Sequence, residues 1–128
     1  MVIPSKLDAA QEAENKLLEE VAKHAYSEES IFAIKLAVEE ALNNAVKHGN
    51  GFDSNKTISL TFRVGPGEAV VTITDQGNGF DPETLADPTA EENLHKPTGR
   101  GIMLMRAYMD EVRFNEKGNQ VHMVKKNT

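Results

Sequence analysis

An alternating stretch followed by a tight turn limits most strongly what this chain can fold into. Residues 57–64 place an apolar side chain at every second position, which is the pattern of a strand with one buried face. Gly65-Pro66-Gly67 then turns the chain, and the β-branched residues of 69–74 indicate a second strand. Two consecutive strands joined by a short turn are expected to pair antiparallel. The chain therefore contains a hairpin with one face that other elements must bury.

Two amphipathic helices precede this hairpin. Ser5 can cap a helix that begins near Lys6, because the apolar residues after it recur at three- and four-residue steps. Ser27, followed by acidic residues, is expected to cap a second helix over about residues 30–48. Gly49-Asn50-Gly51 ends that helix.

A long polar stretch, a third helix and a second pair of strands follow the hairpin. The polar stretch covers residues 81–98, and the largely apolar third helix begins at Thr98-Gly99-Arg100-Gly101. Residues 112–115 and 120–125 form the last two strands. Helices in runs and strands in hairpins predict an α+β, two-layer α/β sandwich with a mixed or antiparallel sheet and its helices on one face. A chain of 128 residues is expected to form one domain over 1–128.

Composition excludes several classes of function. Fourteen Lys and Arg against 20 Asp and Glu give a net charge of −6, which disfavours general nucleic-acid binding. The absence of cysteine excludes disulfides, thiolate metal sites and thiol nucleophiles. The sequence contains no apolar stretch long enough to span a bilayer and opens on no signal-like segment, so a cytoplasmic protein is expected.

The second helix carries a carboxylate one turn before a carboxamide. Two Glu–Asn pairs have this spacing, and a helical wheel distinguishes them. It places Glu40, Asn44 and His48 along one edge of the apolar arc, whereas the other set faces mostly outward: Glu39, Asn43 and Lys47. Such a carboxylate can act as a general base beside a Mg²⁺ ion that the amide oxygen helps to hold. An isolated pair of this kind is also compatible with a solvated helix edge.

A carboxylate and two glycines follow the second strand of the hairpin, in the segment Asp75-Gln76-Gly77-Asn78-Gly79-Phe80. Glycines at Gly77 and Gly79 allow a ligand to approach the backbone, while Asp75 can accept a hydrogen bond from an exocyclic amino group such as that of adenine. The alternative is a plain Asp/Gly turn. A calcium loop fits poorly, because the regular series of oxygen ligands is missing.

The start of the third helix is a candidate phosphate site. Free amides and the helix dipole favour an anion there, and Gly99 and Gly101 let a phosphate reach the backbone. Neither a dinucleotide fingerprint nor a P-loop is present. The preceding polar stretch, about residues 81–98, lies where a lid would close over a ligand.

These elements together resemble a known family. The segments EEALNNAVKHGN, DQGNGF and TGRGIMLMRAYMDEVRF are similar to the N, G1 and G2 boxes of the gyrase, Hsp90, histidine kinase and MutL superfamily, the GHKL or Bergerat-fold ATPases. Within it, the chain most resembles the anti-sigma factor serine/threonine kinases of bacterial partner-switching systems. The resemblance extends from Ile3 to about Lys126.

The resemblance implies roles for the boxed residues. Glu40 matches the general base for a serine of a partner protein, Asn44 the Mg²⁺ ligand, and Asp75 the adenine-binding aspartate. The glycines match those that line the nucleotide: Gly77 and Gly79 beside the base, Gly99 and Gly101 at the phosphates.

Three further positions keep two interpretations each. Arg100 either contacts phosphate or a partner, or is a solvated residue at a helix start, and His48 has either a packing or capping role or a direct ligand role. Where the family has Gly-Thr before the last strand, this chain has Gly118-Asn119, and Asn119 either bonds at the adenine site or points to solvent. Relatives commonly begin with a longer edge strand than Met1-Val2-Ile3, which leaves the sheet edge and a homodimer open.

The function implied is that of an ATP-dependent serine/threonine protein kinase and anti-sigma-type regulator. Its cofactors would be ATP and Mg²⁺, its substrate an anti-sigma factor antagonist, and a sigma factor a further partner. The alternative is a non-enzymatic ATP-binding module that sequesters a regulatory protein without phosphorylating it. Glu40 favours the kinase, because a pure binder does not need a general base and histidine kinases commonly have Asn at that site.

Overall fold

The computed structural model describes residues 1–77 and 99–127, which form a two-layer α+β sandwich. The sheet consists of five antiparallel strands in the order β1-β2-β3-β5-β4. Of the two arrangements that the sequence left open, mixed or antiparallel, the antiparallel one is present. The strands are β1 (Val2–Pro4), β2 (Thr57–Val64), β3 (Glu68–Thr74), β4 (Glu111–Phe114) and β5 (Gln120–Lys126). The helices are α1 (Leu7–Ala22), α2 (Glu28–Asn44), the π-helix η1 (Ala45–Gly49) and α3 (Gly99–Tyr108).

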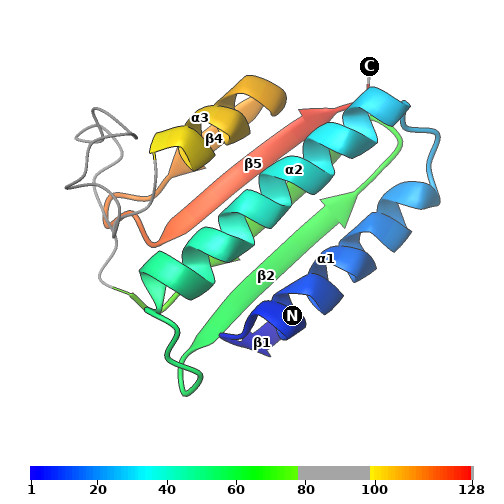
Figure 1. The fold of residues 1–128 in the computed structure, drawn as a ribbon. Helices are drawn as coiled ribbons and strands as arrows, with labels where there is room; N and C mark the ends of the chain where they lie inside the picture. The colour runs from blue at the N-terminus through cyan, green and yellow to red at the C-terminus, as the bar shows by residue number, and fades with distance from the viewer. Residues whose placement is uncertain (78–98, 128) are drawn as a thin grey trace.

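All of these helices cover the same face of the sheet (Figure 1). Helix α2 crosses the middle of that face, with α1 on the side of β1 and β2 and α3 on the side of β4 (Figure 1). The alternation in residues 57–64 turns Ile58 and Leu60 toward the helices, where both are fully buried. Ile34, Val38 and Leu42 of α2 belong to the same buried cluster, which forms the core between the two layers.

The first helix begins differently from the expectation. Its N-cap residue is Lys6, which makes no side-chain capping bond, and the helix ends at Ala22. The predicted cap Ser5 is buried instead, with its backbone N–H donating to the Lys56 oxygen 3.1 Å away. Ser5 cannot cap the helix because it leaves β1, a three-residue edge strand whose Ile3 pairs with Ile58 of β2.

The second helix begins as expected and ends differently. The Ser27 side chain accepts a hydrogen bond from the Ser30 N–H at 3.1 Å, so this cap prediction is confirmed, and α2 starts at Glu28. Residues 45–49, which include the first glycine of the predicted stop, form a π-helix rather than a continuation of the α-helix. In this wider turn, the Asn50 N–H donates to the Ala45 oxygen at 2.8 Å. Single π turns of this kind occur frequently at functional sites.

No helix within 1–77 and 99–127 is long and apolar enough to cross a membrane. The predicted lid, residues 81–98, lies outside the described residues, as does Gly79.

Candidate nucleotide site

A cleft lies between α2, η1, α3 and the ends of β3 and β5, and it contains about 500 Å³ of space that is partly open to solvent. Its described walls are largely apolar: Ala41, Ala45, Ile73, Met105, Phe114 and Val121. Its polar lining includes Asn44, His48, Asp75, Asn119 and Gln120. Asp75 is the only carboxylate among the described lining residues. An apolar slot with one carboxylate fits a flat heterocycle that offers a hydrogen-bond donor.

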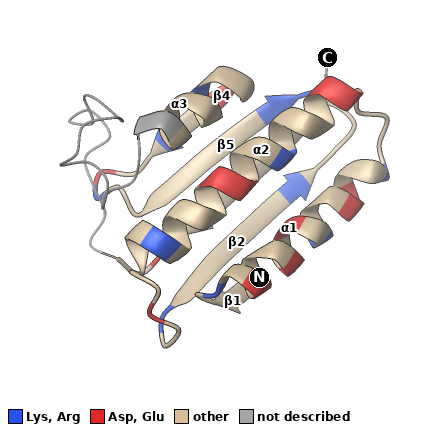
Figure 2. Ribbon diagram, viewed as in Figure 1, with Lys and Arg blue, Asp and Glu red and all other residues tan. Residues whose placement is uncertain are grey.

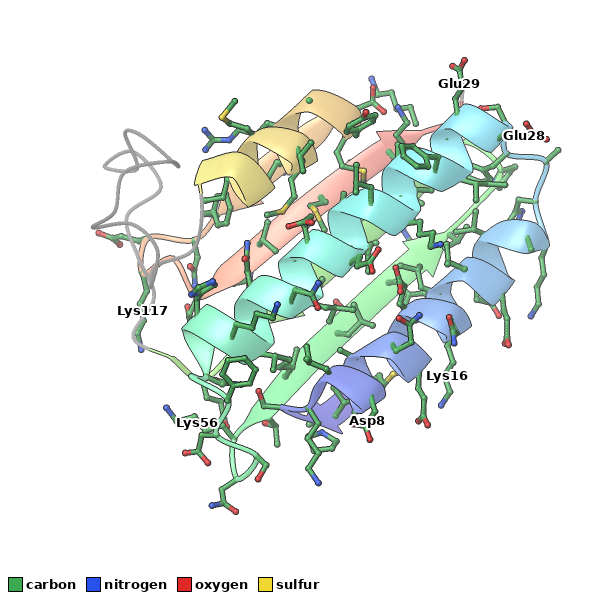
Figure 3. The ribbon with its side chains drawn as sticks, in the orientation of Figure 1. Asp8, Lys16, Glu28, Glu29, Lys56 and Lys117 are labelled. Carbon is green, nitrogen blue, oxygen red and sulfur yellow. The ribbon has the colours of Figure 1, made fainter. Side chains whose placement is uncertain are left out.

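Asp75 is held in this cleft by its own loop. The Gly77 N–H donates to Asp75 Oδ1 at 2.7 Å. Burial raises the pKa of the Asp75 carboxyl above its ordinary value, while the Gly77 hydrogen bond and the charges of Lys117 and Lys56 act in the opposite direction. Figure 3 shows Lys56 and Lys117 at the same end of the molecule. The two lysines therefore partly offset the negative charge of the Asp75 carboxylate in a chain of net charge −6.

Two glycines make room for the carboxylate. A side-chain carbon at Gly49 would collide with the carboxylate of Asp75, and one at Gly77 would collide with the backbone of Gly49. The three residues are therefore in direct contact, and only glycine fits at the two positions. The sequence identified Gly77 but treated Gly49 as a helix stop, because nothing local shows that Asp75 lies against it.

Asn50 connects the end of η1 to the strands. Its side chain is 2% exposed, and its Nδ2 donates to the Thr57 oxygen at 3.0 Å. Its Oδ1 accepts from the Gln76 N–H at 2.8 Å, and the Gln76 side chain in turn accepts from the Thr57 N–H at 2.7 Å. This network fixes the loop after Asp75 against the start of β2. The sequence did not reveal it, because Asn in a Gly-Asn-Gly stop has an ordinary local explanation.

Asn119 points toward Asp75 rather than to solvent. Its Nδ2 donates to the Asp75 backbone oxygen at 3.1 Å, and its own backbone oxygen accepts from the Asp75 N–H at 2.9 Å. Asn119 also lines the cleft, so its side chain and Asp75 lie in the same part of the molecule.

Asn44 lines the cleft, and its Nδ2 is buried without a hydrogen-bond partner among the described residues. Glu40, one turn earlier on α2, is half-buried and is not among the described residues that line the cleft. His48 lines the cleft from η1 and is also half-buried.

The outward set of the helical wheel is placed only partly as predicted. Lys47 is exposed, as expected. Glu39 and Asn43, however, are half-buried and line a small second cleft together with Gln11 and Glu14 of α1. The wheel failed there because it treats a helix as having a single buried face, whereas α2 packs on the sheet and on α1 at once.

At the candidate phosphate end, Gly99 begins α3 and Gly101 is buried in its first turn. Arg100 lies between them in the helix. From α3, Met105 reaches the cleft. These positions agree with a helix that begins at the predicted glycines.

Comparison with known proteins identifies the domain. The family model for the histidine kinase-like ATPase domain matches residues 3–125. The serine-protein kinase RsbW of Oceanobacillus iheyensis is 29% identical over 98% of this chain and 84% of its own length. RsbW of Bacillus subtilis strain 168 is 35% identical over 78% of this chain and 67% of its own length. The serine/threonine-protein kinase BtrW of Bordetella bronchiseptica is 31% identical over 72% of this chain and 66% of its own length.

Solved structures show the same fold. The structure of the RsbU and RsbW domains of Rv1364c from Mycobacterium tuberculosis superposes with a TM-score of 0.61 at 18% identity; it covers 99% of this chain, which spans 31% of that longer chain. The mycobacterial sensor histidine kinase MprB gives a TM-score of 0.54 at 20% identity, over 75% of this chain and 71% of its own. The five-stranded sheet, its helical layer and the match over residues 3–125 lead to one conclusion: the chain belongs to the histidine kinase-like ATPase domain family and is similar to its RsbW serine kinases.

Proposed function

We propose that this protein is an ATP-dependent serine kinase that phosphorylates a partner protein of the anti-sigma factor antagonist type. The observation that carries the nucleotide half of the proposal is the apolar cleft with Asp75 fixed at its end. The similarity to proteins named serine-protein kinase supports the transfer half.

Asp75 suits adenine for a chemical reason. An ionised carboxylate accepts hydrogen bonds and cannot donate them, so it favours the exocyclic amino group of adenine over the carbonyl oxygen of guanine. The apolar walls from Ile73, Met105 and Val121 provide the contact surface that a purine ring requires. The Asn119 side-chain amide, which donates to the Asp75 backbone oxygen, and the Gly77 N–H, which donates to Asp75 Oδ1, keep the acceptor in place without a ligand.

Asn44 fits the magnesium role. Its carboxamide lines the cleft with one buried polar atom unpaired among the described residues, and rotation of the amide presents the oxygen instead. Magnesium commonly takes few protein ligands and completes its shell with substrate phosphates and water. That agrees with the absence of a cluster of three or more His, Asp or Glu ligands in the described part of the chain. When bound, the ion supplies neutralisation of the phosphate charge.

Glu40 is proposed as the general base. In the transfer, the hydroxyl oxygen of the partner's serine bonds to the γ-phosphorus, the bond from that phosphorus to the β,γ-bridging oxygen breaks, and ADP leaves with that electron pair. The hydroxyl proton passes to the Glu40 carboxylate. Its half-buried position on α2, one turn from Asn44, leaves the carboxylate accessible to a protein hydroxyl that approaches from outside the cleft.

The remaining proposals concern the phosphate contacts, the partner proteins and the cellular location. Gly79, Gly99, Arg100 and Gly101 are proposed to contact the nucleotide together with the lid at about residues 81–98, and His48 to have a packing role. A sigma factor as a second partner and a homodimer are proposed on the resemblance alone, and a cytoplasmic location on the lack of a signal-like or membrane-spanning stretch in the sequence. We propose no direct contact with nucleic acid, because the net charge is −6.

A two-part experiment tests the function. Calorimetry with ADP and with ATP plus Mg²⁺ tests the cleft, and the absence of heat at millimolar nucleotide would contradict the proposal. A pull-down from native lysate with and without ATP, followed by mapping of phosphoserine in the captured protein, tests the transfer. Capture without phosphorylation in either nucleotide state would favour the non-enzymatic binding module.

A further inference from the structure

The turn between β4 and β5 is organised by the side chain of Asn115. Its Oδ1 accepts three backbone N–H groups, from Gly118 at 2.7 Å, Asn119 at 3.0 Å and Gln120 at 3.2 Å. Gly118 has a positive φ of 81°, which permits this tight return. An exposed asparagine therefore determines the path of the four residues that lead into β5.

The same side chain also orients Asn119. Asn115 Nδ2 donates to Asn119 Oδ1 at 2.7 Å, while Asn119 Nδ2 donates to the Asp75 oxygen at 3.1 Å. A carboxamide with its oxygen toward a donor and its nitrogen toward an acceptor has one orientation that satisfies both bonds. Both polar atoms of the Asn119 side chain thus have partners inside the protein.

The chain of contacts ends at the carboxylate in the cleft. Asn119 holds the main chain of Asp75 at two points, the N–H at 2.9 Å and the carbonyl oxygen at 3.1 Å. Beyond that clamp, Gly77 and Gly49 fix the carboxylate itself. The exposed turn and the half-buried acceptor therefore form one hydrogen-bonded unit.

We propose that Asn115 and Asn119 are positioning residues for Asp75, and that this turn determines how strongly the cleft prefers adenine over guanine. The inference rests on the proposed nucleotide function. A carboxylate held in place discriminates between the amino group of adenine and the carbonyl oxygen of guanine, because it cannot move away from the unfavourable oxygen–oxygen contact with guanine. A carboxylate that is free to move avoids this contact, so guanine is rejected less strongly.

Asn115→Asp and Asn119→Ala test the proposal. The first keeps the oxygen that accepts the three N–H groups but replaces the donor to Asn119, and the second removes the Asp75 bond without adding charge. Calorimetry with ADP and GDP is expected to show that the affinity for ADP is about tenfold lower in both variants. The ratio of the ADP affinity to the GDP affinity should fall by a similar factor. The melting temperature is expected to stay within about 2 °C of the parent.

Asn55→Asp is the matched control. Asn55 lies in the exposed loop before β2, and its side chain has no hydrogen bond among the described residues, so the variant adds the same charge without touching the turn. This variant should keep the parent's ratio of ADP affinity to GDP affinity. If the parent binds ADP and both turn variants keep its affinity and ratio within twofold, the inference is wrong. A fall in melting temperature above about 5 °C in both would assign the turn to folding and also overturn it. No ADP binding by the parent would instead refute the proposed function, and the inference with it.

Discussion

The carboxylate of Asp75 lies directly against the Cα of Gly49, so closely that no side chain fits between them. Gly49 ends the π-helix η1, and Asp75 follows β3, so the contact joins the two layers of the sandwich at the cleft. The wide turn of η1 and the buried Asn50 hold one side of this contact, and the β4–β5 turn holds the other. The acceptor in the cleft thus depends on residues from three separate parts of the chain.

Gly49→Ala should weaken nucleotide binding, because the new methyl group occupies the position of the Asp75 carboxylate. We expect ADP affinity to fall by at least about tenfold, measured by calorimetry. Gly67→Ala is the control, since a side-chain carbon there meets open space. Unchanged ADP binding by Gly49→Ala would show that the carboxylate is not held where the structure places it.

Asp75→Asn should remove ADP binding, because an amide presents a donor where adenine also has one. For the parent, binding should weaken as the pH falls through the raised pKa of Asp75, since the protonated carboxyl no longer accepts at both oxygens. Fluorescence titration with a labelled ADP between pH 4 and pH 8, a range that begins near the ordinary Asp pKa of about 3.9 and extends above it, measures this. Asp53→Asn, in an exposed turn, provides the comparison and should bind as the parent does.

Glu40→Gln should leave nucleotide binding intact and lower phosphoryl transfer by about 10²–10⁴-fold, the contribution of a general base. Glu39→Gln, the neighbouring carboxylate that faces α1, should keep transfer near the parent rate. The readout is incorporation of labelled phosphate into the captured partner protein. Equal losses in the two variants would mean that charge on α2, not proton transfer at Glu40, supports the reaction.

Glu14→Gln should stabilise the protein at neutral pH. The Glu14 side chain is 2% exposed, its Oε2 accepts from Gln11 at 2.8 Å, and its Oε1 has no hydrogen-bond partner among the described residues. Burial and then the charge of Glu39 raise its pKa, against the smaller opposing effects of Gln11 and Lys35. The stability that this carboxyl contributes is therefore present below its unfolded pKa and is lost as the pH rises through the folded one.

The free energy of unfolding of Glu14→Gln should exceed that of the parent by on the order of 1 kcal/mol at pH 8, with little difference near pH 4. Urea unfolding at both pH values measures it. Glu12→Gln, an exposed position on the same helix, should show no such dependence. A gain for Glu14→Gln that is equal at both pH values would refute the link to ionisation.

The sequence by itself determined those features that a short window of residues decides. The period-two pattern of 57–64 predicted β2, and the Ser27 cap predicted the start of α2. The family resemblance of the boxes grouped Asn44 with Asp75, and both line the cleft, whereas Glu40 is not among its described lining residues. Strand alternation and capping depend on the backbone of a few neighbouring residues, so they can be predicted without the rest of the fold.

Tertiary structure alone decided the features that depend on a distant partner. Three residues are too few to show a period, so β1 emerged only through its pairing with β2. The same holds for Gly49 against Asp75, for the link of Asn115 and Asn119 to the cleft, and for Glu39 turning toward α1. In each case the conformation is set by close packing or a hydrogen bond to a segment far along the chain, and no local pattern of residues carries that information.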